Sequence, residues 1–261
     1  AGIGPHDRPF GQSHFLHPFR VVRVLGDRDV RPSRVLDPVE SGLVEERLEG
    51  SGIHLHRHTE VERVEGRRGC VEAVRIRAGQ RLRLLTGGKT RDFSLIPGDR
   101  HDQLVLLIRW VADGVVSSHL SRCPLGTAFD FTGPSGHFIY RPSSRPAIWV
   151  ATGTGIAPFV AMCRIGMRGF VVLHGVRHDD ELYFRDIMEP AALRYVPCLT
   201  GDPSSSSSQA FPGRVTDYLR HRFPEGEYDF YLAGRREMIA EVMDIADHRF
   251  PSSRVYSEIF F

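Results

Sequence analysis

The sequence predicts two domains, an antiparallel β-barrel followed by an α/β domain with a parallel sheet. In the second half of the chain, apolar runs such as 147–151, 170–174 and 230–233 alternate with helix-like segments. These runs lack the period-two alternation of half-exposed strands, which indicates strands buried on both faces of a parallel sheet. In the middle of the chain, short strand-like segments are separated by Gly, Pro and Asp turns, a pattern typical of an antiparallel barrel or sandwich.

The α/β domain is expected to cover residues 144–261, because the composition shifts at Arg141-Pro142-Ser143-Ser144. Its strands are expected at 147–151, 170–174, 195–199, 230–233 and 254–260. One helix is expected to begin at Pro158, and three others are expected at 179–188, 214–222 and 237–248.

The barrel domain is expected to cover residues 18–143, after an N-terminal extension at 1–17. Its strands are expected at 80–85, 91–96, 103–110 and 128–132, with helical character only near 117–120.

The first eighty residues allow two interpretations. Strand-like segments lie at 19–25, 34–36, 53–65 and 71–76, and a helix-like one at 43–48. We favour two barrel strands, an insertion at about 41–75, and a barrel that resumes at Ala78-Gly79-Gln80. Alternatively, residues 34–80 resemble weakly a segment of the nucleotide domain in pyridine nucleotide–disulfide oxidoreductases.

Composition excludes several classes of function. The formal charge of +2 on 261 residues gives no support for nucleic-acid binding. No apolar run approaches the ~20 residues of a membrane helix, and residues 1–10 lack the layout of a signal peptide. The four cysteines (Cys70, Cys123, Cys163 and Cys198) are far apart, which argues against an iron–sulfur cluster, a four-cysteine zinc site or a disulfide framework. A cytoplasmic location fits best.

A glycine-rich turn carries the strongest functional signal. Gly153-Thr154-Gly155-Ile156-Ala157-Pro158 lies between an apolar strand and a helix. Glycines let the backbone approach a pyrophosphate, and the helix N-terminus that follows supplies free N–H groups. The alternative is a tight structural connection.

Two further segments have the residue types of a flavin site. In Arg91-Asp92-Phe93-Ser94, the arginine could bridge phosphates, the ring could cover a flavin, and the hydroxyl could bond a flavin nitrogen. The start of a short helix at Gly114-Val115-Val116-Ser117-Ser118 could hold a second phosphate. For each segment taken alone there is an alternative: an ordinary strand for the first, and an ordinary N-capped helix for the second.

In this order and spacing, these motifs resemble the ferredoxin–NADP reductase family. The resemblance covers about residues 79–261. Its other supporting motifs are 78–80, Gly133-Pro134-Ser135-Gly136-His137-Phe138, Gly213-Arg214-Val215-Thr216 and the ending Glu258-Ile259-Phe260-Phe261.

The resemblance implies roles for individual residues. Arg91 would bind the FAD pyrophosphate, Phe93 would pack on the flavin, and Ser94 would hydrogen-bond near its N5 atom. Phe260 would cover the face where nicotinamide stacks, and Glu258 would lie near the reacting edge, so that Ser94 and Glu258 are the candidate catalytic residues. The residues expected to contact phosphate or NAD(P)H are Gly114, Ser117, Ser118, Gly153, Thr154, Gly155, Ile156, Ala157, Pro158, Arg177, Arg214, Ala233 and Gly234.

Three departures from the family pattern matter: the first loses a hydroxyl contact, the second removes a thiol that could orient nicotinamide, and the third leaves coenzyme preference open. The family usually has tyrosine where this chain has Phe93, and often a Cys-Gly pair where it has Ala233-Gly234. Members that prefer NADP often carry Ser-Arg where this chain has Thr200-Gly201. Arg177 and Arg214 could still bind a 2′-phosphate bidentately, or could be solvated surface arginines.

We expect an FAD-dependent enzyme that transfers electrons between NADPH or NADH and a separate carrier such as ferredoxin or flavodoxin. The alternatives are the reductase component of an oxygenase system and a flavin electron-relay subunit of a larger complex. We expect no bound metal, although His54, His56 and His58 would share one face of a strand and could ligate one.

Overall fold

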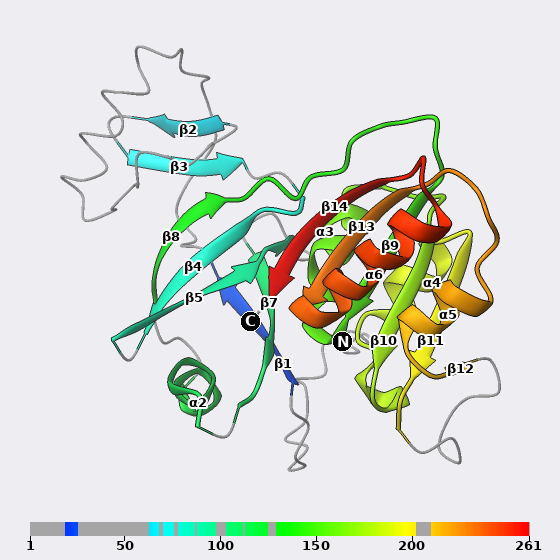
Figure 1. Cartoon of the computed structure of the whole chain (residues 1–261). Helices are drawn as coiled ribbons and strands as arrows, with labels where there is room; N and C mark the ends of the chain where they lie inside the picture. Colours follow the sequence, from blue (N-terminus) through cyan, green and yellow to red (C-terminus); the bar gives the residue numbers. More distant parts are fainter. Residues whose placement is uncertain are drawn as a thin grey trace, which may run out of the picture.

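The computed structural model describes residues 19–25, 63–67, 70–75, 78–86, 88–97, 103–111, 113–124, 129–201 and 210–260. Antiparallel sheets form its N-terminal part, and a parallel sheet covered by helices forms its C-terminal part (Figure 1). The expected segments at 34–36 and 43–48, residues 53–62 of the strand expected at 53–65, and the three alternating histidines lie outside the described residues.

Two three-stranded antiparallel sheets form the N-terminal part next to the cleft described below. One has the order β1 (Phe19–Leu25), β7 (Gln103–Arg109), β6 (Ile96–Pro97), and the other β5 (Lys89–Ser94), β4 (Arg81–Thr86), β8 (Asp130–Ser135). A separate hairpin pairs β2 (Arg63–Arg67) with β3 (Cys70–Arg75), and the helix α2 (Val115–Arg122) follows β7.

The chain passes from one sheet to the other within the segment 91–96, which was expected to be one strand. Residues up to Ser94 pair with β4, and from Ile96 the chain pairs with β7 instead. At the corner, the Leu95 amide donates to the Gln80 carbonyl at 2.9 Å. Strands that switch sheets in this way are how packed antiparallel sheets share one core.

The C-terminal part is a six-stranded parallel sheet in the order β12-β11-β10-β9-β13-β14. Its strands are β9 (Ala147–Thr152), β10 (Val171–Val176), β11 (Arg194–Leu199), β12 (Phe211–Pro212), β13 (Asp229–Arg235) and β14 (Arg254–Phe260). Its helices are the 3₁₀ turns η1 (Gly153–Ile156) and η2 (Asp179–Glu181) and the α-helices α3 (Ala157–Arg164), α4 (Arg185–Ala191), α5 (Val215–His221) and α6 (Arg236–Arg249).

Two apolar clusters, one on each face, hold the helices to this sheet. Trp149 of β9 packs with α3 and α4 in one cluster, and Ile148 packs with α5 and α6 in the other. The first cluster also contains Ile96 and Leu107, so the antiparallel part shares a core with the α/β part. The guanidinium of Arg164 adds a hydrogen bond to the Pro97 carbonyl across the same boundary.

The expected fold class is confirmed, with one further difference in an element. The helix expected at 179–188 is divided into η2 and α4, because Phe184 has a left-handed backbone (φ 59°) that a continuous helix does not allow. No described helix has the length and apolar run needed to span a bilayer. The domain boundaries at 17 and 143 and the insertion at about 41–75 stay predictions.

Candidate active site

A cleft of about 2200 Å³ lies between the two parts of the molecule. One wall comes from β5, β7 and the start of α2, and the other from the carboxyl ends of β9, β10, β13 and β14. In the sheet, β10, the next strand in the sequence, lies on one side of β9, and β13 lies on the other side, so the strand order reverses at β9. Reversal points of this kind are where open α/β sheets bind ligands.

The glycine-rich turn forms the centre of the α/β wall, and its glycines are required by close packing. A Cβ atom on Gly155 would lie 2.1 Å from the Ala233 carbonyl oxygen. A Cβ atom on Gly234 would lie 2.2 Å from Thr152 Oγ1, and φ there is +140°. Because η1 packs so closely on β13, Gly153, Thr154 and Ala157 face the cleft, and the N-terminus of η1 has no side-chain cap.

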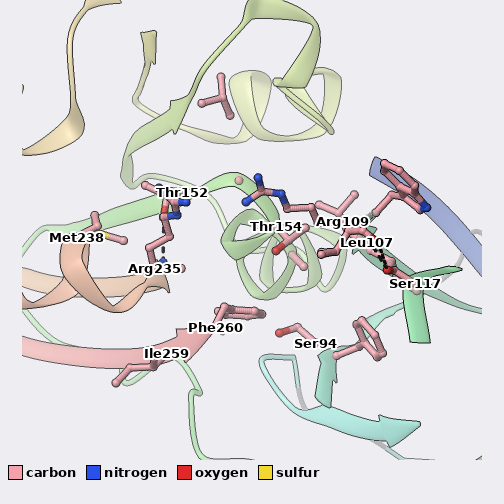
Figure 2. Close-up of a pocket in the computed structure, with 18 of the residues that line it drawn as sticks. Ser94, Leu107, Arg109, Ser117, Thr152, Thr154, Arg235, Met238, Ile259 and Phe260 are labelled. Atoms are coloured by element: carbon pink, nitrogen blue, oxygen red, sulfur yellow. Dashed lines mark hydrogen bonds between the residues drawn. The ribbon is translucent and has the colours of Figure 1, made fainter. Parts of the chain in front are cut away.

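A polar contact joins the two walls. Ser94 at the end of β5 donates its hydroxyl to Glu258 Oε2 of β14 at 3.4 Å, although the two residues are 164 positions apart in the sequence. Glu258 is only 7% exposed. Burial raises the pKa of its carboxyl to about 7, against the opposing influence of Arg81 and of the Ser94 hydrogen bond. Phe260 and Ser94 are directed into the same space (Figure 2).

The flavin-binding motifs predicted on the other wall lie along β5 and α2. Arg91 is exposed and donates to the Thr90 carbonyl at 2.8 Å, and Phe93 is half-buried beside it. Ser117 uses its hydroxyl within its own loop, where it accepts from the Val111 amide at 3.1 Å. The first N–H groups of α2 therefore face the cleft without a side-chain cap.

Arginines and carboxylates lie together at the end of β10. Arg177 and Arg214 are both exposed and line the cleft. Glu181 accepts hydrogen bonds from the amides of Arg177 and His178, at 2.8 and 3.0 Å, which fixes the loop that carries Arg177. A Cβ atom on Gly201 would lie 2.4 Å from the Arg177 carbonyl oxygen, so this turn is also closely packed.

A buried histidine lies on the strand next to the glycine-rich turn. The Nδ1 atom of His174 is 2.8 Å from the Tyr195 hydroxyl, and the side chain is fully buried. Burial lowers the pKa of His174 to about 4, although the Gly153 backbone acts in the opposite direction. The imidazole is therefore neutral in the physiological range.

The structure brings most of the predicted residues to one cleft. Those that line it are Arg91, Phe93, Ser94, Gly114, Ser117, Gly153, Thr154, Ala157, Arg177, Arg214, Gly234, Glu258 and Phe260. Five predicted residues do not line it and support its walls instead: Ser118, Gly155, Ile156, Pro158 and Ala233. Their roles in binding and catalysis stay predictions.

Sequence reasoning missed several residues that line the cleft. They include Arg109, Thr152, Arg235 and Met238, which Figure 2 shows around the glycine-rich turn. Arg109 and Thr152 are each the last residue of a strand that is otherwise largely apolar. The position of a polar residue at the end of a buried strand is the signal that could have identified both.

The cleft fits a flavin and a dinucleotide. Gly155 leaves no room for a side chain behind the turn, and Gly234 leaves none in the wall of the cleft. The Thr216 hydroxyl is buried against the cleft with no hydrogen-bond partner among the described residues. Such a group in a native structure indicates a ligand or water that the site receives.

Comparison with known proteins agrees with this geometry. Residues 71–140 match the oxidoreductase FAD-binding domain, and residues 149–244 match the oxidoreductase NAD-binding domain. A cytochrome P450 reductase from Amycolatopsis has a similar fold, with a TM-score of 0.64 at 24% identity over 94% of this chain and 71% of that one.

Two curated relatives extend the comparison. The chain is 33% identical to the toluate 1,2-dioxygenase electron transfer component of Pseudomonas putida over 63% of its length, and it spans 52% of that protein. It is 30% identical to ferredoxin–NADP reductase B of Sorangium cellulosum over 73% of its length and 84% of that protein. The chain spans about half the length of the dioxygenase component, but most of the ferredoxin–NADP reductase. It belongs to the ferredoxin–NADP reductase family of oxidoreductases.

Proposed function

We propose that this chain is an FAD-dependent reductase that takes electrons from NADPH or NADH and passes them to a separate one-electron carrier. The observation that carries this proposal is the Ser94–Glu258 contact. It joins β5, the strand expected to contact the flavin, to β14, the last strand of the nucleotide domain, inside the cleft. Bound FAD would accept a hydride and release single electrons, chemistry that no side chain supplies.

The chain's own residues would bind and orient the two nucleotides. Arg91 and the N-terminus of α2 would hold the FAD phosphates, and Phe93 would pack on the ring system. Gly153 and Thr154 would hold the pyrophosphate of the coenzyme by backbone N–H groups, with Ala157 beside them in the wall of the cleft. Since the chemistry needs two ring systems in contact, most of the protein's contribution would be positioning.

Ser94 and Glu258 would supply the polar groups at the edge of the reacting rings. Their hydrogen bond holds a hydroxyl and a buried carboxyl where the two walls meet. With a pKa of about 7, Glu258 can hold or release a proton near neutral pH. Phe260 would occupy the nicotinamide position until the coenzyme arrives.

The carrier is proposed to be a ferredoxin, a flavodoxin or an oxygenase component. The oxygenase alternative is favoured by the similarity to a dioxygenase electron transfer component. Copurification of an oxygenase that this chain reduces would decide for it. We place the reaction in the cytoplasm, where the free thiols of Cys123, Cys163 and Cys198 would stay reduced.

An anaerobic titration of the purified protein with NADPH and then NADH tests the proposal. We expect a yellow protein whose visible flavin absorbance bleaches with at least one coenzyme. The better coenzyme shows whether Arg177 and Arg214 recognise a 2′-phosphate. Flavin that neither coenzyme reduces would favour a relay subunit, and a chain unable to hold flavin would contradict the proposed cofactor.

A further inference from the structure

An arginine on β4 contacts two carboxylates that both line the cleft. Arg81 Nη1 lies 3.7 Å from Glu258 Oε1, and its Nε lies 3.5 Å from Asp92 Oδ2. The register of β4 and β5 places Arg81 directly opposite Ser94. The Glu258 carboxylate is therefore contacted by Ser94 from one strand and by Arg81 from the neighbouring strand.

Asp92 is itself held by a second arginine. Arg83 Nε and Nη2 donate to the two Asp92 oxygens at 2.7 and 3.0 Å. The Arg83 hydrogen bond, the largest influence, lowers the pKa of Asp92 below its usual value. Asp92 therefore stays an anion near neutral pH and gives Arg81 a fixed second contact.

Arg81 is the cation among the groups that act on Glu258. Burial and the negative charge of Asp92 raise the pKa of Glu258, while Arg81 and the Ser94 hydroxyl lower it. These groups come from β4 and β5, the strands that face this end of β14. The Ser94 hydroxyl can donate to the neutral carboxyl as well as to the carboxylate. Among these groups, only Arg81 therefore favours the ionised form by its charge.

We propose that Arg81 is a positioning residue, which orients the Glu258 carboxylate and favours its ionised form, and which is itself paired with Asp92. The effect on Glu258 depends only on the contacts described above. Its consequence for electron transfer rests on the proposed function. In this role Arg81 acts through Glu258.

The test is an infrared titration of the Glu258 carboxyl in the flavin-loaded full chain without coenzyme. The band is assigned by its absence in Glu258→Gln. Three variants separate the contributions: Arg81→Gln removes the cation, Arg81→Lys keeps it, and Asp92→Asn removes the neighbouring anion. Arg83→Gln is the matched control, because it removes an arginine of the same strand that contacts Asp92 and not Glu258.

We expect opposite shifts from the two neutralising variants. Arg81→Gln should raise the titration midpoint of Glu258 by about one pH unit or more, and Arg81→Lys should return it at least halfway. Asp92→Asn should lower the midpoint, and Arg83→Gln should move it less than Arg81→Gln does. A merely structural loss would not give opposite signs. An unchanged midpoint in Arg81→Gln, equal shifts in both arginine variants, or an upward shift in Asp92→Asn would overturn the proposal.

Activity distinguishes this proposal from the proposed function. The pH profile of coenzyme-driven ferricyanide reduction should move with the infrared midpoint in Arg81→Gln. If coenzyme does not reduce the flavin at all, the proposed function fails while the titration still tests Arg81. If the Glu258 midpoint is unchanged in Arg81→Gln while coenzyme reduces the flavin normally, only the proposal for Arg81 fails.

Discussion

Glu258 shows how one residue of the site opposes the stability of the fold. A carboxyl that is 7% exposed loses most of its hydration, and the Arg81 contact at 3.7 Å offsets this only in part. A raised pKa means that the folded protein binds a proton more tightly than the unfolded chain does. A protein is often less stable with its functional residues than with other residues at the same positions.

The stability of the protein should therefore fall as pH rises through the titration of Glu258. The contribution of this group is fully present below its ordinary pKa of 4.5 and is lost as the pH passes about 7. The loss is on the order of 3 kcal/mol. Denaturant unfolding at pH 5 and pH 8 measures it, and Glu258→Gln should lack this decline. A parallel decline in the variant would show that other groups cause it.

His174 should have the opposite dependence on pH. Its pKa is lowered from 6.5 to about 4, so its contribution is present above pH 6.5 and is lost as the pH falls toward 4. His174→Phe should lose about 1–3 kcal/mol at pH 8, because the Tyr195 hydroxyl loses its partner. The variant should then lose less stability than the native chain between pH 6.5 and 4.

Tyr195→Phe is the matched control for this prediction. It removes the same hydrogen bond and keeps the buried imidazole, so its acid sensitivity should stay close to that of the native chain. Equal acid sensitivity in all three proteins, measured by unfolding at several pH values, would contradict the assignment to His174.

At the scale of elements, the binding turn depends on how closely η1 and β13 approach. Gly155→Ala would place a methyl group 2.1 Å from the Ala233 carbonyl oxygen, so η1 or β13 must move. We expect at least a tenfold loss of coenzyme affinity with flavin content retained, because the expected flavin contacts lie on β5 and α2. Stability should fall by about 1–3 kcal/mol.

Gly166→Ala controls for the general effect of adding a methyl group. Gly166 lies in the same part of the chain, with no atom within 4 Å of the added Cβ, although its φ is +101°. It should lose stability through backbone strain and keep its affinity for coenzyme. Equal coenzyme affinities in the two variants, measured by flavin bleaching, would contradict the close-approach argument.

The elements show what could be predicted from sequence. Buried runs in the α/β half, such as β9, were found within one or two residues, because length and apolarity are local properties. The division of 91–96 into β5 and β6 was missed, since it depends on which strand pairs with each residue. Both Ser94 and Glu258 were predicted as site residues from the family resemblance. The hydrogen bond between them could not be predicted from local sequence patterns, because it joins residues of different domains.

At the scale of the whole molecule, charge is unevenly placed although the net charge is only +2. On the antiparallel side, the cleft is lined by Arg81, Arg83, Lys89, Arg91 and Arg109, against Asp92 and Asp113. This excess of cations lies on β4, β5 and β7, in the wall that is expected to contact the flavin. A local field of one sign attracts a partner of the other sign even when the net charge is small.

Reduction of an acidic one-electron carrier should therefore weaken steeply with salt. We expect kcat/KM for an acidic ferredoxin to fall by about tenfold or more between 0.05 and 0.5 M salt, at saturating coenzyme. Reduction of a small uncharged quinone under the same conditions is the control, and it should change little. Parallel salt responses would place the effect on coenzyme binding or flavin reduction. A flat response for the ferredoxin would contradict electrostatic attraction and point to a carrier recognised by apolar contacts.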